Sequence, residues 1–217
     1  MNDVRIRLLR EGDWDGLVAL EERAYAASGL SEGRAALQSR HRASPDTCFV
    51  LEHAGGFGGY LLALPYPLFR CPDLSRSEAG GVRATNMHAH DLVVAEELRG
   101  RGLGHRLLRH LEETARAAGY RTVSLVAVGG AQVVWGPLGY RARPEVDLPE
   151  SYGPQAVYMA MPLGPVAAPA VLPAAPAPVP AAAPVPSPAP APVPGVPRPP
   201  ARSTEPSPGS PPRAEVG

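Results

Sequence analysis

Apolar and polar positions along the first 163 residues follow patterns that predict a mixed α/β fold. Alternation and short apolar runs predict strands at residues 4–8, 48–52, 60–64, 87–95, 122–128 and 156–161. Apolar residues at helical spacing predict helices at residues 11–26, 30–42 and 102–119, with a short helical turn at 131–135. The strongest helical stripe consists of Leu103, Leu107, Leu108, Leu111 and Ala115.

Glycine and proline mark the predicted connections. Three glycines within residues 55–58 predict a hairpin with a loose loop over residues 54–59, and prolines predict an open loop over residues 65–81. The hairpin implies antiparallel pairing, and the helix at 102–119 implies a crossover between parallel strands. We therefore expect a single α/β domain with a mixed, partly antiparallel sheet flanked by helices.

Composition divides the chain after Leu163. Most of its 28 prolines lie in residues 164–217, among many alanines and valines, and no aromatic residue follows Tyr158. Because proline lacks an amide donor, neither helix nor sheet can run through such a segment. The composition predicts a folded domain at residues 1–163 and a disordered Pro/Ala-rich tail at residues 164–217.

Charge, hydropathy and cysteine spacing argue against nucleic-acid binding, membrane insertion and a zinc site. The 21 basic residues are all arginine, equal the 21 acidic residues in number and form no basic block, which argues against nucleic-acid binding. No apolar run reaches the length of a membrane span, and the charged N-terminus argues against a signal peptide. Cys48 and Cys71 lack the spacing of a zinc site, so we expect free thiols and a cytoplasmic protein.

A glycine-rich loop at residues 99–104 is the most informative motif. It follows a predicted strand and leads directly into a helix, where glycines permit close backbone approach and the helix end offers free amides. This combination suits a pyrophosphate. A Walker A loop requires a lysine, which the chain lacks, and a GxGxxG fingerprint fails because His105 occupies the third glycine position.

The spacing Arg-x-x-Gly-x-Gly at residues 99–104 resembles the coenzyme A loop of the GNAT acetyltransferases. Residues 135–140, WGPLGY, are similar to the later Tyr-x-x-x-Gly-Phe motif of that superfamily. The resemblance covers nearly the whole folded part and implies acetyl-CoA as cosubstrate. It implies that the pantetheine arm lies where two parallel strands splay apart, with the Val94 amide as oxyanion donor. The implied contacts are Leu92, Val93 and Val94 along the arm, Arg99, Gly100, Arg101, Gly102, Leu103 and Gly104 at the pyrophosphate, and Trp135 beside the thiol.

His88 and His90 are the candidate proton acceptors. An alkyl amine with a pKa of ~10.4 is almost fully protonated at pH 7, so its acetylation needs a base, and histidine suits this role. Residues 88–94, HAHDLVV, resemble the His-x-His-x-Leu-Ala-Val strand of arylalkylamine N-acetyltransferases, whose two histidines relay the proton. We expect His90 as base and His88 as relay, on the face that carries Leu92 and Val94. Asp91 is expected on the other face.

Alternatives stay open for these histidines. Either one can instead be a structural core residue. A metal bound by the pair would need a third ligand, and because none is evident we expect no metal site.

The general acid is also open, because Trp135 stands where many family members have the tyrosine that protonates the coenzyme thiolate. Tyr152, before the last strand, is the candidate replacement, and water is the other.

The resemblance implies an N-acetyltransferase that acts on a primary amine, expected to be a small molecule. Two alternatives remain: acetylation of a protein N-terminus or lysine, and a non-catalytic acyl-CoA-binding module, which only Trp135 favours. A homodimer is left open.

Overall fold

The computed structural model describes residues 4–80 and 82–164, which contain a seven-stranded sheet in the order β1-β2-β3-β4-β5-β7-β6. The strands are β1 (Val4–Leu8), β2 (Phe49–His53), β3 (Gly56–Pro65), β4 (Asn86–Val94), β5 (Thr122–Ala127), β6 (Arg141–Ala142) and β7 (Val157–Pro162). The α-helices are α1 (Trp14–Tyr25), α2 (Gly33–Ala43), α3 (Leu103–Ala117) and α4 (Gln132–Trp135). The α/β class is confirmed, and the short β6 is the only one of these strands that the sequence pattern misses. The predicted tail lies, apart from Gly164, outside the described residues.

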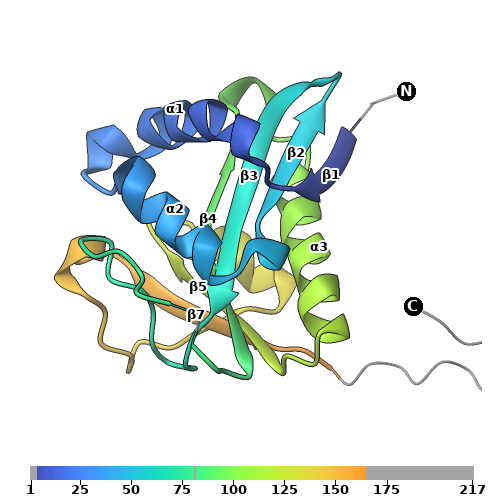
Figure 1. Cartoon of the computed structure of the whole chain (residues 1–217). Helices are drawn as coiled ribbons and strands as arrows, with labels where there is room; N and C mark the ends of the chain where they lie inside the picture. The colour runs from blue at the N-terminus through green and yellow to red at the C-terminus, as the bar shows by residue number, and fades with distance from the viewer. Residues whose placement is uncertain (1–3, 81, 165–217) are drawn as a thin grey trace, which may run out of the picture. The chain divides into compact units, whose positions relative to one another are not determined.

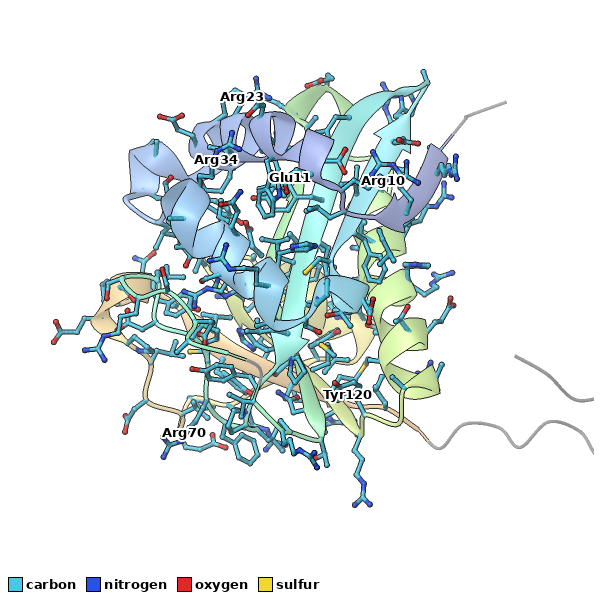
Figure 2. The ribbon with its side chains drawn as sticks, in the orientation of Figure 1. Arg10, Glu11, Arg23, Arg34, Arg70 and Tyr120 are labelled. Carbon is cyan, nitrogen blue, oxygen red and sulfur yellow. The ribbon has the colours of Figure 1, made fainter. Side chains whose placement is uncertain are left out.

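Helices cover both faces of the sheet (Figure 1). α1 and α2 lie over one face, where the labelled Arg34 of α2 pairs with Asp15 of α1 and the labelled Arg23 of α1 is exposed (Figure 2). α3 covers the other face with the predicted apolar stripe, which is buried throughout. Full burial of a single leucine such as Leu107, which is 0% exposed, contributes about 1.5–3 kcal/mol. The stripe therefore fixes α3, and with it the loop that precedes α3, against the sheet.

The glycine-rich segment after β2 is not the loose loop that the sequence predicts. The turn is confined to residues 54–55, and the glycines that follow lie within β3. A Cβ atom on Gly59 would lie 2.7 Å from the carbonyl oxygen of Val93, and one on Gly58 would lie 2.8 Å from the side chain of Leu98. Gly59 therefore allows β3 and β4 to approach closely, and a larger residue there would push the two strands apart, while Gly58 leaves room for Leu98 beyond β4.

β4 and β5 are the parallel pair that the crossover helix predicts, but they pair over only part of their length. Residues 86–89 lie opposite residues 122–125, and beyond this point β5 pairs only with β7. The carboxyl-terminal half of β4 consequently separates from β5, as the family resemblance implies. No helix in the described ranges is long and apolar enough to cross a bilayer.

Candidate active site

A groove of about 830 Å³ follows the separation of β4 from β5. We call it the β4–β5 groove. It extends from the three last residues of β4 to the loop before α3, and its far wall is α4. Its lining includes Leu92, Val93, Val94, Arg99, Gly100, Gly102, Leu103, Gly104, His105 and Trp135. The structure thus brings together the predicted coenzyme-binding residues, although Arg101 does not line the groove.

The loop before α3 has the geometry of an anion cradle. Gly100 and Gly102 have φ angles of +73° and +72°, which side chains other than glycine rarely adopt. No backbone hydrogen bond within the described part of the chain uses the amides of residues 100–105, because they precede or begin the helix. These amides are free to donate to a pyrophosphate, so the loop fits the group that the resemblance implies.

The main chain of β4 also offers donors to the groove. The Ala95 amide donates to the Gly58 carbonyl at 3.0 Å, and amides of an antiparallel strand alternate in direction. The amides of Leu92 and Val94 therefore point away from β3, towards the side where β5 has separated. This is the placement expected of a strand that pairs with a pantetheine arm.

A β-bulge in β4 changes which side chains share a face. Ala89 lies opposite Ala63 and Asp91 lies opposite Leu62, so His90 is an extra residue without a partner in β3. One consequence corrects the sequence prediction: Asp91 lies on the same face as His88, although the two are three residues apart. Regular alternation, which the prediction assumed, would place them on opposite faces.

The same bulge corrects the predicted position of the histidines relative to the end of the strand. Leu92 lies opposite Leu61 in β3 and so faces α3, where a Cβ atom on Gly104 would contact it at 3.4 Å. His90 instead contacts Glu32 at the start of α2, on the opposite face. His90 therefore does not share a face with Leu92.

His90 lines an inner pocket of about 560 Å³ that shares Tyr25, Leu92, Arg99 and Trp135 with the β4–β5 groove. Its side chain is 0% exposed, and its Nε2 atom lies 2.5 Å from Oε1 of Glu32. Its Nδ1 atom has no hydrogen-bond partner within the described structure. One ring nitrogen is thus held by a carboxylate while the other is left without a partner.

Glu32 is fixed by a second contact. Its Oε2 atom lies 2.7 Å from the guanidinium of Arg40, which is 0% exposed and also binds Glu78 at 2.7 Å. Burial alone would raise the pKa of Glu32, but the nearby His90 and Arg40 outweigh it and lower that pKa. Glu32 is therefore an ionised carboxylate in a fixed position. Sequence reasoning missed it, because an acidic residue at the head of a helix is common and gives no signal.

His88 is fully buried behind His90 and lines neither the groove nor the inner pocket. The two ring centroids are 6.2 Å apart, and Nδ1 of His88 is 3.0 Å from Oγ of Ser124. Burial in the first place lowers the pKa of His88 well below its ordinary value, and the charge of Arg40, and of His90 whenever it is protonated, acts in the same direction. His88 is consequently placed as a neutral residue without direct access to a bound substrate.

Asp91 receives hydrogen bonds from two tyrosines that the sequence did not single out. The Tyr25 hydroxyl donates to Oδ1 at 2.9 Å, and the Tyr60 hydroxyl donates to Oδ2. Burial raises the pKa of Asp91 from 3.8 to about 6. Tyr25, at the end of α1, lines both the groove and the inner pocket, so it also contributes to the site.

The two candidates for the acid step occupy different places. Tyr152 is 7% exposed, its hydroxyl donates to the Pro72 carbonyl at 2.9 Å, and it does not line the groove or the inner pocket. Burial raises the pKa of Tyr152 well above 10. Trp135 lines both cavities, with its ring centroid 6.5 Å from that of His105. Among the described residues no group of three His, Cys, Asp or Glu side chains is arranged to hold a metal ion.

Comparison with known proteins identifies the class to which this fold and groove belong. The sequence pattern of the Acetyltransferase (GNAT) family matches residues 14–133, more than half of the chain. The chain therefore belongs to the GNAT acetyltransferase family. No curated protein sequence matches it.

Solved structures of the same fold share little sequence with this chain. The GphF GNAT-like decarboxylase in complex with isobutyryl-CoA has a TM-score of 0.60 at 22% identity, over 73% of this chain and 99% of that one. Ard1 from Thermoplasma volcanium has a TM-score of 0.57 at 16% identity, over 74% and 97%. A GNAT family acetyltransferase from Brucella melitensis in complex with acetyl-CoA has a TM-score of 0.51 at 20% identity, over 76% and 91%. At these identities the likeness shows the fold alone.

Proposed function

We propose that the chain transfers an acetyl group from acetyl-CoA to a primary amine, with His90 as the general base. The observation that carries this proposal is the Nδ1 atom of His90, which is buried in the pocket where the β4–β5 groove ends and has no partner among the described residues. A base in that position can accept a proton from an amine that approaches from the side opposite the coenzyme.

The groove supplies the coenzyme-binding part of the reaction. Amides of residues 100–104 would hold the pyrophosphate, and the amides of Leu92 and Val94 would bind the pantetheine arm and the acyl oxygen. Acetyl-CoA supplies a thioester carbonyl to which an amine nitrogen can add. Trp135 would pack beside the arm and limit the access of water to that point.

Glu32 determines which nitrogen of His90 acts as the base. A carboxylate can only accept hydrogen bonds, so the 2.5 Å contact requires the proton of the neutral imidazole to lie on Nε2. The lone pair then lies on Nδ1, which can take a proton from the amine. A positioned base of this kind contributes roughly 10²–10⁴-fold in rate.

Neither Trp135 nor Tyr152 is well suited to protonate the leaving thiolate. The indole of Trp135 is not an acid at neutral pH, and the Tyr152 hydroxyl is engaged by Pro72 outside the groove. A thiolate whose conjugate acid has a pKa of ~8.5 can leave with protonation by water. We therefore favour water over Tyr152 for this step, and we keep His88 as a candidate relay behind His90.

The acceptor reaches the inner pocket through an opening of about 430 Å³ lined by the segment after α1 and the segment before β7. Ser28, Leu30, Val128 and Gly129 line both the opening and the inner pocket. An opening of this size admits a small amine or the end of a peptide chain. Protein acetylation thus stays the alternative, as does acyl-CoA binding without turnover.

Release of free thiol from acetyl-CoA in the presence of amine, peptide and protein acceptors tests the proposal. We expect release with at least one amine, and a loss of about 10²-fold or more in His90→Gln at unchanged acetyl-CoA affinity. His53→Gln, in β2 and outside these cavities, is the matched control and should retain the wild-type rate. A His90→Gln variant with the wild-type rate would exclude His90 as base, and coenzyme binding without release for every acceptor would favour the non-catalytic module.

A further inference from the structure

A small pocket beside His90 is lined by three carboxylates. This acidic pocket, of about 50 Å³, includes Glu21 on α1, Glu32 before α2, and Asp91 and His90 on β4. It shares Tyr25, Leu30, His90, Val126 and Val128 with the inner pocket, so it adjoins the position proposed for the reacting amine. None of its lining residues is an arginine.

The carboxylates of the acidic pocket lack sufficient counter-charge. Among the residues that the structure describes, Glu21, which is 1% exposed, accepts hydrogen bonds only from neutral donors, the Ser31 hydroxyl at 2.7 Å and the Glu32 amide at 2.8 Å. Asp91, which is 8% exposed, accepts from two tyrosine hydroxyls. Within residues 4–80 and 82–164 no ion pair involves either carboxylate.

Arg40 does not correct this imbalance, because it is shared between Glu32 and Glu78. Buried carboxylates in proteins are normally paired with a cation, since burial of an unpaired charge is costly. The composition of the acidic pocket therefore calls for a positive charge that the described protein residues do not supply.

A second observation points to a ligand in the same place. Nδ1 of His90 is buried and has no partner in the described part of the chain, and its side chain lines both the acidic pocket and the inner pocket. An imidazole lone pair beside carboxylates presents only acceptors. The group that complements them is a donor with positive charge, which is the description of an alkylammonium.

We propose, on the basis of the function proposed above, that the acceptor is an aliphatic diamine or related polycation, with one ammonium held by Glu21 and Asp91 while a second amine reacts. The volume of the acidic pocket accommodates an ammonium with the methylenes next to it. An amino acid is disfavoured because its carboxylate would meet carboxylates. Arg70, which would offer a cation, lies in the β3–β4 loop (labelled in Figure 2) and lines a separate cavity.

Three four-carbon acceptors isolate the role of charge: 1,4-diaminobutane, butylamine and 4-aminobutanoate. We expect kcat/KM for thiol release to be about tenfold or more higher for the diamine than for butylamine, and lowest for the amino acid. Glu21→Gln should reduce the preference for the diamine to within about threefold. Glu22→Gln, its exposed neighbour on α1, is the matched control and should keep the full preference.

The outcomes separate this inference from the function on which it rests. Equal rates with the three acceptors in the wild-type protein would overturn the inference and leave the acetyltransferase proposal intact. A second outcome would support the cation site and overturn the function. In it, none of the acceptors gives thiol release, but calorimetry shows that 1,4-diaminobutane binds and that Glu21→Gln abolishes this binding. Because the comparison of acceptors uses the wild-type protein, it remains decisive even if Glu21→Gln fails to fold.

Discussion

The contact between Glu32 and His90 leads to a sharp prediction for Glu32→Gln. Glutamine has the same shape but only one side-chain oxygen, together with an NH₂ group. The guanidinium of Arg40 can only donate, and it lies 2.7 Å from one Glu32 oxygen. The amide oxygen should therefore face Arg40, which leaves the NH₂ group directed at Nε2 of His90.

That arrangement would reverse the tautomer of His90. If the amide donates to Nε2, the imidazole proton must lie on Nδ1, the atom proposed to act as the base. In catalytic triads, replacing the carboxylate by an amide costs about 10⁴ in kcat for this reason. Because an uncharged amine needs no base, the loss here should be smaller at high pH, and we expect about 10²–10⁴-fold at neutral pH.

The variant should also be less stable. The Glu32 side chain is 4% exposed, so solvent screens its contacts little. Loss of one charge-assisted hydrogen bond costs about 1.5–3 kcal/mol. In a domain of this size that lowers the melting temperature by roughly 3–12 °C.

Three measurements test this reasoning: thiol release as a function of pH, thermal denaturation, and ¹⁵N NMR of the His90 ring. Glu78→Gln is the matched control, since it removes the other carboxylate of Arg40 without touching His90. It should lose stability but stay within about threefold of the wild-type rate. A folded Glu32→Gln protein with a near wild-type rate, or with the proton still on Nε2, would refute the role assigned to Glu32.

Three further predictions concern the strand and the groove. Gly59→Ala would place a Cβ atom 2.7 Å from the Val93 carbonyl oxygen and should destabilise the domain by about 1–3 kcal/mol in urea denaturation, whereas Gly12→Ala, with open space around it, should have little effect. Asp91→Asn should raise the melting temperature more at pH 8 than at pH 5. Burial raises the pKa of the Asp91 carboxyl to about 6 in the folded protein, compared with 3.8 in the unfolded chain. The protonated carboxyl therefore contributes its full stability below pH 3.8, and this contribution is lost, by up to about 3 kcal/mol, as the pH rises through 6. Trp135→Ala should weaken acetyl-CoA binding in calorimetry by about tenfold or more, and unchanged affinity would remove the indole from the coenzyme site.

The sequence predicted those parts of the fold that depend on local pattern. The apolar stripe of α3 and the glycines before it are visible in the sequence, because helical spacing and positive φ angles impose strong residue preferences. The alternation in β1 predicted its strand for the same reason. These features were sufficient to predict the separation of β4 from β5 through the family resemblance.

The site depends on contacts between segments distant in sequence, and the sequence did not reveal them. Glu32 meets His90 across 58 positions, and Tyr25 meets Asp91 across 66. The extra residue in β4 has no signature in a single sequence, so Asp91 was placed on the wrong face. The role of His88 came from the resemblance to a His-x-His strand and that of Tyr152 from residue type and position, and neither residue lines the inner pocket.

The bulge makes the chemistry of β4 depend on a count of residues as well as on their identity. Removing Ala89 would restore a regular ladder with β3, and His90 would then lie opposite Ala63, on the face of Leu92 and away from Glu32. A relative that keeps every site residue but has one position fewer in this strand would therefore lose the contact between His90 and Glu32. Searches for proteins with the same acceptor preference should first require the same number of residues between His88 and Asp91 and only then the same residue types.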